Sequence, residues 1–311
     1  MTAPTLNDVR EAAERIRPHV HRTPVMTSAT FDREIGAQVF FKCENLQKVG
    51  AFKARGAVNA VLSLDPPSAS NGVITHSSGN HGAALAYAAG IRGIRCTVVM
   101  PDDTPAIKVG AVRSYGAEVV FCARSERNAV CDRVMQERGS TLIHPYENPR
   151  VIAGAGTAAF ELMGDVESLD LLIAPVGGGG LLSGTALSST GARPPLQLFG
   201  AEPEAVDDAY RSLTSGVRQP AVEDPPTVAD GLMTGLGKIN FEILRQREAE
   251  VVVISEQEIL EAARFVLERM KLVVEPSGAT VVAALRKLGD RVRGRRIGAI
   301  FSGGNTDFAW L

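Results

Sequence analysis

The chain has 311 residues, of which 45% are hydrophobic and 22% charged, and its formal net charge is −2 at pH 7. A chain of this length can bury a core divided between two lobes, and the near-neutral charge gives no reason to expect nucleic acid or a membrane as a partner. The four cysteines form no CxxC pair, so we expect neither a disulfide framework nor a zinc site, and reduced thiols favour a cytoplasmic protein.

Short apolar runs of strand length alternate along the chain with helical patterns. We expect strands at residues 38–42, 72–75, 96–100, 118–121, 171–176, 197–200, 250–253 and 297–301. Helices are expected at residues 1–17, 52–63, 81–90, 105–114, 129–137 and 256–270. This alternation predicts an α/β protein with two lobes, each built on a mostly parallel sheet flanked by helices.

The order of these elements also predicts the boundaries of the two lobes. Residues 72–147 contain three strands and are expected to form a small mobile domain. Residues 1–65 and 149–311 are expected to form the large domain, so the chain crosses between the lobes twice.

Four of the predicted strands end at unusual residues. They are followed by His76–His81, Gly177–Gly180, Glu202 and Ser302–Asn305. Because ligands bind at the carboxyl ends of parallel strands, we expect these segments to converge on one site.

Lys53 and the glycine run Gly177–Gly180 together indicate a cofactor. Lysine forms a Schiff base with an aldehyde, and a glycine-rich turn between a strand and a helix binds phosphate through its backbone N–H groups. Pyridoxal 5'-phosphate carries both groups, so the pair predicts an enzyme that uses this cofactor. A solvated lysine and glycines required only for tight packing are the alternatives.

The segment Ser77–His81 precedes or begins a predicted helix. Its hydroxyl groups are typical of ordinary helix caps. The free N–H groups at a helix start also bind anions, so the same segment is a candidate for the substrate carboxylate.

Five motifs, in one order, resemble the serine/threonine dehydratase and serine racemase family of fold type II pyridoxal-phosphate enzymes, which are tryptophan synthase β-like. The resemblance runs from about residue 23 to residue 305. The motifs occupy residues 42–47, 52–57, 76–82, 175–180 and 302–305.

The resemblance implies a set of cofactor contacts. Lys53 carries the cofactor, Phe52 packs on its ring, Asn80 meets the 3-hydroxyl, and Ser302 faces the pyridine nitrogen. The phosphate is held by the glycine loop, Gly177, Gly178, Gly179 and Gly180. A neutral hydroxyl at Ser302 weakens the electron sink, which favours rapid expulsion of a β-leaving group.

The resemblance also implies substrate contacts. Ser77, Ser78, Asn80 and His81 lie in the turn expected to bind the substrate, and Ser78 is expected on the cofactor face opposite Lys53, where it could carry a proton. Arg127 matches a family arginine near the substrate mouth and suits a second acidic group, although a solvated arginine fits the sequence equally well.

A divalent cation is implied by the stretch from Gly200 to Asp208, which resembles the family's metal site. Glu202 and Asp208 would supply carboxylate oxygens and Val206 a backbone carbonyl, a set that suits Mg²⁺, Ca²⁺ or Mn²⁺. A solvated acidic turn is the alternative reading.

Two departures from the family pattern leave the substrate open. Ala51 stands where the family usually has serine, and Tyr146 stands where serine racemases have a small polar residue. We expect β-elimination of serine or threonine to a 2-oxo acid and ammonia. The alternatives are dehydration of threo-3-hydroxyaspartate, or racemisation with dehydratase side activity. A homodimer is expected by resemblance.

Overall fold

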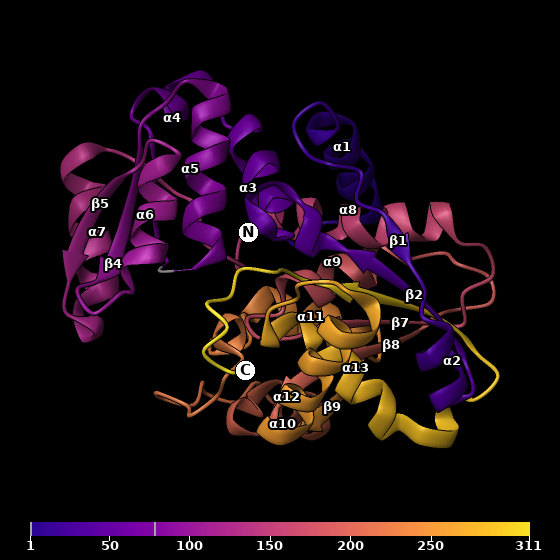
Figure 1. Ribbon diagram of the computed structural model, residues 1–311. Coiled ribbons are helices and arrows are strands. Elements are labelled where there is room, and N and C mark those ends of the chain that lie inside the picture. The colour runs from indigo at the N-terminus through magenta and orange to yellow at the C-terminus, as the bar shows by residue number, and fades with distance from the viewer. Residues whose placement is uncertain (1, 78) are drawn as a thin grey trace.

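The computed structural model describes residues 2–77 and 79–311 and contains two separate sheets (Figure 1). The larger sheet has six strands in the order β1-β2-β10-β7-β8-β9, and the smaller has four in the order β5-β4-β3-β6. All neighbouring strands run parallel except β1 and β2. The expected α/β fold with mostly parallel sheets is therefore confirmed.

The larger sheet draws its strands from both ends of the chain. They are β1 (Val25–Met26), β2 (Gln38–Cys43), β7 (Leu171–Pro175), β8 (Gln197–Pro203), β9 (Glu250–Ile254) and β10 (Arg296–Phe301). The helices of this part of the chain are α1 (Leu6–Ile16), α2 (Ala29–Ile35), α3 (Lys53–Leu62), α8 (Pro149–Asp165), α9 (Gly180–Ser188), α10 (Asp208–Ser215), α11 (Lys238–Gln246), α12 (Glu256–Phe265) and α13 (Pro276–Leu288).

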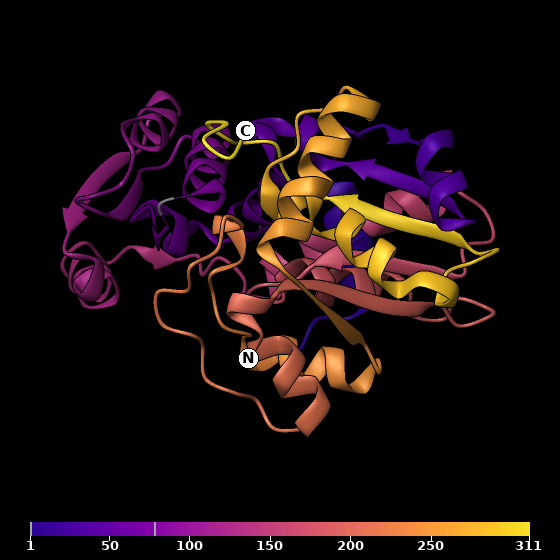
Figure 2. The same ribbon diagram turned by 60° about the horizontal axis from the view of Figure 1, so that its bottom comes forward.

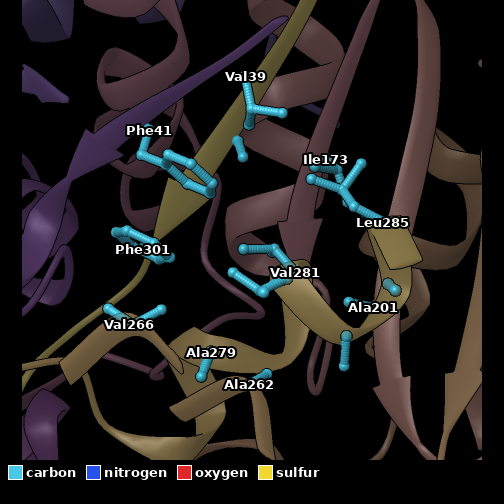
Figure 3. Packing of buried hydrophobic residues seen from close by; sticks show 14 of the residues in the cluster. Val39, Phe41, Ile173, Ala201, Ala262, Val266, Ala279, Val281, Leu285 and Phe301 are labelled. Atoms are coloured by element: carbon cyan, nitrogen blue, oxygen red, sulfur yellow. The ribbon is translucent and has the colours of Figure 1, made fainter. Parts of the chain in front are cut away.

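Both faces of the larger sheet are covered by helices. Side chains alternate between the faces of a strand, so Ile173 of β7 packs with α12 and α13, whereas Leu172 and Ala174 pack with α8 and α9. Figure 3 shows the first of these cores, in which the rings of Phe41 and Phe301 stack with centroids 4.5 Å apart. Burial on both faces explains why the strands read as continuous apolar runs.

The smaller sheet is formed by one uninterrupted stretch of chain (Figure 2). Its strands are β3 (Val73–His76), β4 (Cys96–Pro101), β5 (Glu118–Cys122) and β6 (Thr141–Leu142), and its helices are α4 (Pro66–Ser70), α5 (Asn80–Arg92), α6 (Ala106–Ser114) and α7 (Arg127–Arg138). Cys43, Cys96, Cys122 and Cys131 are free and buried. Within the described residues, no helix is both long and apolar enough to cross a bilayer.

The helix expected over residues 256–270 differs from the structure. Helix α12 ends at Phe265, and Val266–Met270 continues as a π-helix that ends at Lys271 in the left-handed region, with φ 58°. This wider turn leads directly into Glu275, which the site described below contains.

Candidate active site

Lys53 is the first residue of α3, immediately after an isolated bridge between Ala51 and Gly303. Its side chain is half-buried, and Nζ donates a hydrogen bond to the carbonyl oxygen of Pro145 at 2.9 Å. Burial lowers the pKa of Lys53 to about 8, while the negative charge of Glu275 acts in the opposite direction. The amine is thus close to losing its proton at neutral pH. Phe52 lies beside it, with Nζ 5.1 Å from the ring centroid.

Glu275 is a buried carboxylate that the sequence reading missed. It accepts hydrogen bonds from Asn80 Nδ2 at 3.0 and 3.1 Å and from the backbone N–H of Asn305 at 3.2 Å. Burial raises its pKa to about 7, against the effect of these donors. No local pattern marks it, because its partner Asn80 lies 195 residues away.

The glycine loop lies between β7 and α9 and is buried throughout. Among the described residues, the backbone N–H groups of Gly177–Gly180 have no hydrogen-bond acceptor. A Cβ on Gly177 would lie 2.9 Å from Leu232 Cα, and one on Gly178 would overlap the Tyr146 ring. Buried unpaired donors beside a helix N-terminus fit a phosphate group, which supports the expected cradle.

Ser302 follows β10 and is buried near Lys53. Its carbonyl accepts a hydrogen bond from the N–H of Phe52 at 2.9 Å, so the end of β10 is tied directly to the start of α3. The structure therefore brings together the ends of β7 and β10 and the helix that carries Lys53.

The turn that is expected to bind the substrate leads into α5. Gly79 is the N-cap residue and makes no side-chain cap, and the Ser77 hydroxyl accepts a hydrogen bond from the N–H of Gly79 at 3.3 Å. Ser77 is therefore not an ordinary cap of this helix. Ser78 lies outside the described residues. Asn80 is the first residue of α5 and reaches the larger lobe through Glu275.

Three histidines in this part of the structure, His76, His81 and His144, have lowered pKa values. His81 Nε2 donates to the carbonyl of Ile143 at 2.9 Å, and its pKa is lowered to about 3 by burial and then by Lys53. Burial also lowers the pKa of His144 to about 4, and its Nδ1 accepts from the N–H of Glu147 at 3.0 Å. His76 packs edge-on against His144. Of the three, only His81 stood among the predicted site residues.

Arg127 and Tyr146 lie beside this histidine group. The positive charge of Arg127 contributes to the lowered pKa of His76 and opposes the burial that raises the pKa of Tyr146. Arg127 Nε is buried and has no hydrogen-bond partner among the described residues. An unsatisfied guanidinium N–H is a candidate donor to an anionic substrate group.

Of the predicted metal ligands, Glu202 lies in β8, Val206 in the short helix that follows it, and Asp208 at the start of α10. Glu202 is buried and accepts from the N–H groups of Ala209 and Tyr210 at 2.9 and 2.8 Å, and Asp208 Oδ2 accepts from the N–H of Leu236 at 2.8 Å. Burial raises the pKa of Glu202 to about 9, and the Asp208 carboxylate adds to the effect. The described residues hold no cluster of three or more His, Cys, Asp or Glu side chains that suits a metal, and this set has only two carboxylates.

A lysine with a lowered pKa, a buried glycine loop with unpaired N–H groups and the buried Glu275 carboxylate together fit the site of a pyridoxal-phosphate enzyme. The sequence matches the family described as pyridoxal-phosphate dependent enzyme over residues 16–303, and the chain belongs to that family.

Relatives of known activity match almost the whole chain. The serine racemase of Dictyostelium discoideum is 46% identical, over 99% of this chain and 97% of its own, and its crystal structure superposes with a TM-score of 0.94 over 98% of this chain and 100% of that chain. An L-threo-3-hydroxyaspartate ammonia-lyase from Pseudomonas sp is 46% identical, over 99% of this chain and 97% of its own. A threonine deaminase structure from T.th. is 42% identical, with a TM-score of 0.93 over 98% of this chain and 100% of its own.

Proposed function

We propose that this protein removes the β-hydroxyl group from a β-hydroxy amino acid such as L-serine or L-threonine and releases a 2-oxo acid and ammonia. The observation that carries the proposal is the half-buried Lys53 amine, whose pKa is about 8, beside the buried, unpaired N–H groups of the glycine loop. Pyridoxal phosphate, when bound, supplies the aldehyde and the electron sink for carbanion chemistry.

The residues of the chain have separate roles in this proposal. Lys53 would hold the cofactor, and Gly177–Gly180 its phosphate. The N-terminus of α5, with Ser77, Asn80 and His81, binds the substrate carboxylate, because its N–H groups have no side-chain cap. The Lys53 amine then takes the α-proton, since its lowered pKa suits a general base at neutral pH. Loss of the β-hydroxyl and hydrolysis of the enamine product give the 2-oxo acid and ammonia.

A second candidate substrate is threo-3-hydroxyaspartate, which carries a further carboxylate. The unsatisfied Nε of Arg127 favours it, because such a donor suits an anion close to the histidine group. Relatives named as beta-hydroxyaspartate dehydratase and L-threo-3-hydroxyaspartate ammonia-lyase support the same substrate. Relatives named as serine racemase support racemisation, for which Ser78 remains the proposed proton carrier.

A panel of serine, threonine and hydroxyaspartate stereoisomers tests these proposals. We expect 2-oxo acid and ammonia in equal amounts from at least one substrate, and none from Lys53→Ala. Arg127→Met should raise KM for hydroxyaspartate by roughly tenfold or more and leave serine turnover within about threefold, because only the former loses a charge-assisted contact. Formation of the D-amino acid without 2-oxo acid would instead identify a racemase.

The domain boundaries, the oligomeric state and the compartment remain proposals of the same kind. We propose that residues 72–147 move relative to residues 1–65 and 149–311, because they form a sheet of their own and are joined to the rest by partly exposed contacts such as Lys108 with Asp230. A homodimer is supported by family membership, and a reducing cytoplasm by the four free, buried cysteines.

A further inference from the structure

The buried side chain of Asn240, in α11, contacts the glycine loop from behind. It is completely buried, and its Nδ2 donates to the carbonyl oxygen of Gly178 at 2.7 Å and to that of Tyr146 at 3.0 Å. We propose that Asn240 is a positioning residue that orients the loop for the cofactor phosphate.

The geometry of the peptide bond provides the first reason. The carbonyl of Gly178 and the N–H of Gly179 belong to one planar trans peptide, so they point in opposite directions. By holding the Gly178 carbonyl, Asn240 directs the Gly179 N–H away from α11, and this N–H has no acceptor among the described residues. A fixed, unpaired donor of this kind is ready to bind phosphate without further rearrangement.

Close packing provides the second reason. A Cβ on Gly179 would lie 2.7 Å from Asn240 Cβ, and one on Gly237 would lie 2.8 Å from Asn240 Nδ2. Gly179 also has φ 89°, which a side chain would strain. The glycine loop therefore packs directly against the side chain of Asn240. The Gly178 carbonyl has one other donor, the N–H of Gly237 at 3.2 Å, which is longer than the bond from Asn240.

The second bond of Asn240 extends this effect toward the lysine. Tyr146, whose carbonyl Asn240 holds, follows Pro145, whose carbonyl accepts from Lys53 Nζ. One amide thus connects the phosphate loop to the segment that holds the amine of the cofactor-binding lysine. The inference goes beyond the proposed reaction, because it concerns cofactor binding and needs no turnover for its test.

The test compares two cofactor forms in Asn240→Leu, which keeps the number and branching of the side-chain heavy atoms and removes both N–H donors. Dissociation constants for pyridoxal phosphate and for unphosphorylated pyridoxal are measured on the apoenzyme by spectral titration. We expect the affinity for pyridoxal phosphate to fall by roughly tenfold or more and that for pyridoxal to change less than about threefold. The phosphorus NMR shift of the bound cofactor should move as well.

A matched control is Asn59→Leu in α3. Asn59 is also completely buried, and its Nδ2 donates to the carbonyl of Arg150 at 2.7 Å, but no described contact joins it to the glycine loop. We expect this variant to be less stable. Its affinity for pyridoxal phosphate should not fall more than its affinity for pyridoxal. Asn240→Ser, whose shorter side chain admits water, provides a second variant if Asn240→Leu does not fold. An unchanged ratio of the two dissociation constants in the Asn240 variants, or an equal change in Asn59→Leu, would overturn the proposal.

Discussion

The pKa values of Lys53 and Glu275 have moved towards each other, to about 8 and about 7, and the charge of Glu275 acts on Lys53. Burial is the main cause for both residues, since it disfavours each charged form. At Lys53 the negative charge of Glu275 opposes this effect. At Glu275 the hydrogen bonds from Asn80 and Asn305 and the charge of Lys108 oppose it. The pair is therefore poised to exchange its charge state within the physiological pH range.

The first consequence concerns the pH dependence of cofactor capture. The neutral amine of Lys53 is the nucleophile, so capture should accelerate as pH rises through about 8. Glu275→Gln removes the negative charge that favours protonated Lys53, so the midpoint should move to lower pH. The pH midpoint of capture is measured by borohydride trapping at a series of pH values, followed by analysis of the peptide that contains Lys53.

The control for this experiment is Glu242→Gln, an exposed carboxylate of α11. The pH midpoint of cofactor capture in this variant should equal that of the unmodified protein. A midpoint in Glu275→Gln that stays near 8 or rises would contradict the predicted role of this carboxylate.

Among single residues, those in short sequence motifs could be predicted. Residues that folding brings to the site from distant parts of the chain could not. Lys53 and the glycine loop have local signatures. Glu275 and Asn240 have none, because their partners Asn80, Gly178 and Tyr146 are between 62 and 195 residues away. His144 was missed for another reason, because its hydrogen bond from Glu147 lies within an irregular turn after β6 that no sequence pattern predicted.

Helix α3 is attached to the larger lobe by a buried group of charges directly behind Lys53. Arg55 is completely buried and binds Glu44 at 2.7 Å and Glu161 at 2.8 Å. Lys42 of β2 also contacts Glu161, at 2.7 Å. These pairs join α3 to β2 and α8, so they fix the position of the helix that begins with Lys53.

Breaking this group should be costly. Arg55→Met leaves the buried Glu44 carboxylate without its cation, and we expect a loss of about 3–5 kcal/mol in the free energy of unfolding. The double variant Arg55→Met with Glu44→Gln should lose less, because the isolated charge is gone. Denaturant unfolding of the apoenzymes measures both, and an equal or larger loss in the double variant would argue against this ion pair.

The strands of four or more residues followed from the sequence, but not all of the helices did. All eight expected strands are present, whereas β1 and β6 were missed, because two residues are too short for any alternation to be seen. Helix α8 was also missed. Most of its residues are buried, among them several alanines and glycines, so it lacks the polar face that marks a surface helix.

At the scale of the whole molecule, the proposed cation should affect global stability. The folded-state pKa of Glu202, about 9, lies above its ordinary value of 4.5, so its contribution to stability is present at low pH and is lost as pH rises towards 9. A bound cation favours the charged form and removes this loss. Mg²⁺ should therefore raise the melting temperature more at pH 8.5 than at pH 6, and EDTA should reverse the gain.

The variant Asp208→Asn tests whether this carboxylate binds the cation. It keeps an oxygen for the hydrogen bond from the Leu236 N–H but removes one charge, so the Mg²⁺ response should shrink. Indifference of the unmodified protein to both Mg²⁺ and EDTA at each pH would remove Glu202, Val206 and Asp208 as ligands.

The smaller sheet comes from one continuous segment, whereas the larger sheet is assembled from chain on both sides of it. One continuous segment of the chain thus contains Ser77, Asn80 and Arg127, the proposed substrate contacts, while Lys53 and the glycine loop lie on either side of it. We expect that exchange of this segment between related enzymes would change the proposed substrate contacts and keep Lys53 and the glycine loop. Evolution could therefore change the amino acid that such an enzyme accepts while the coenzyme-dependent reaction stays the same.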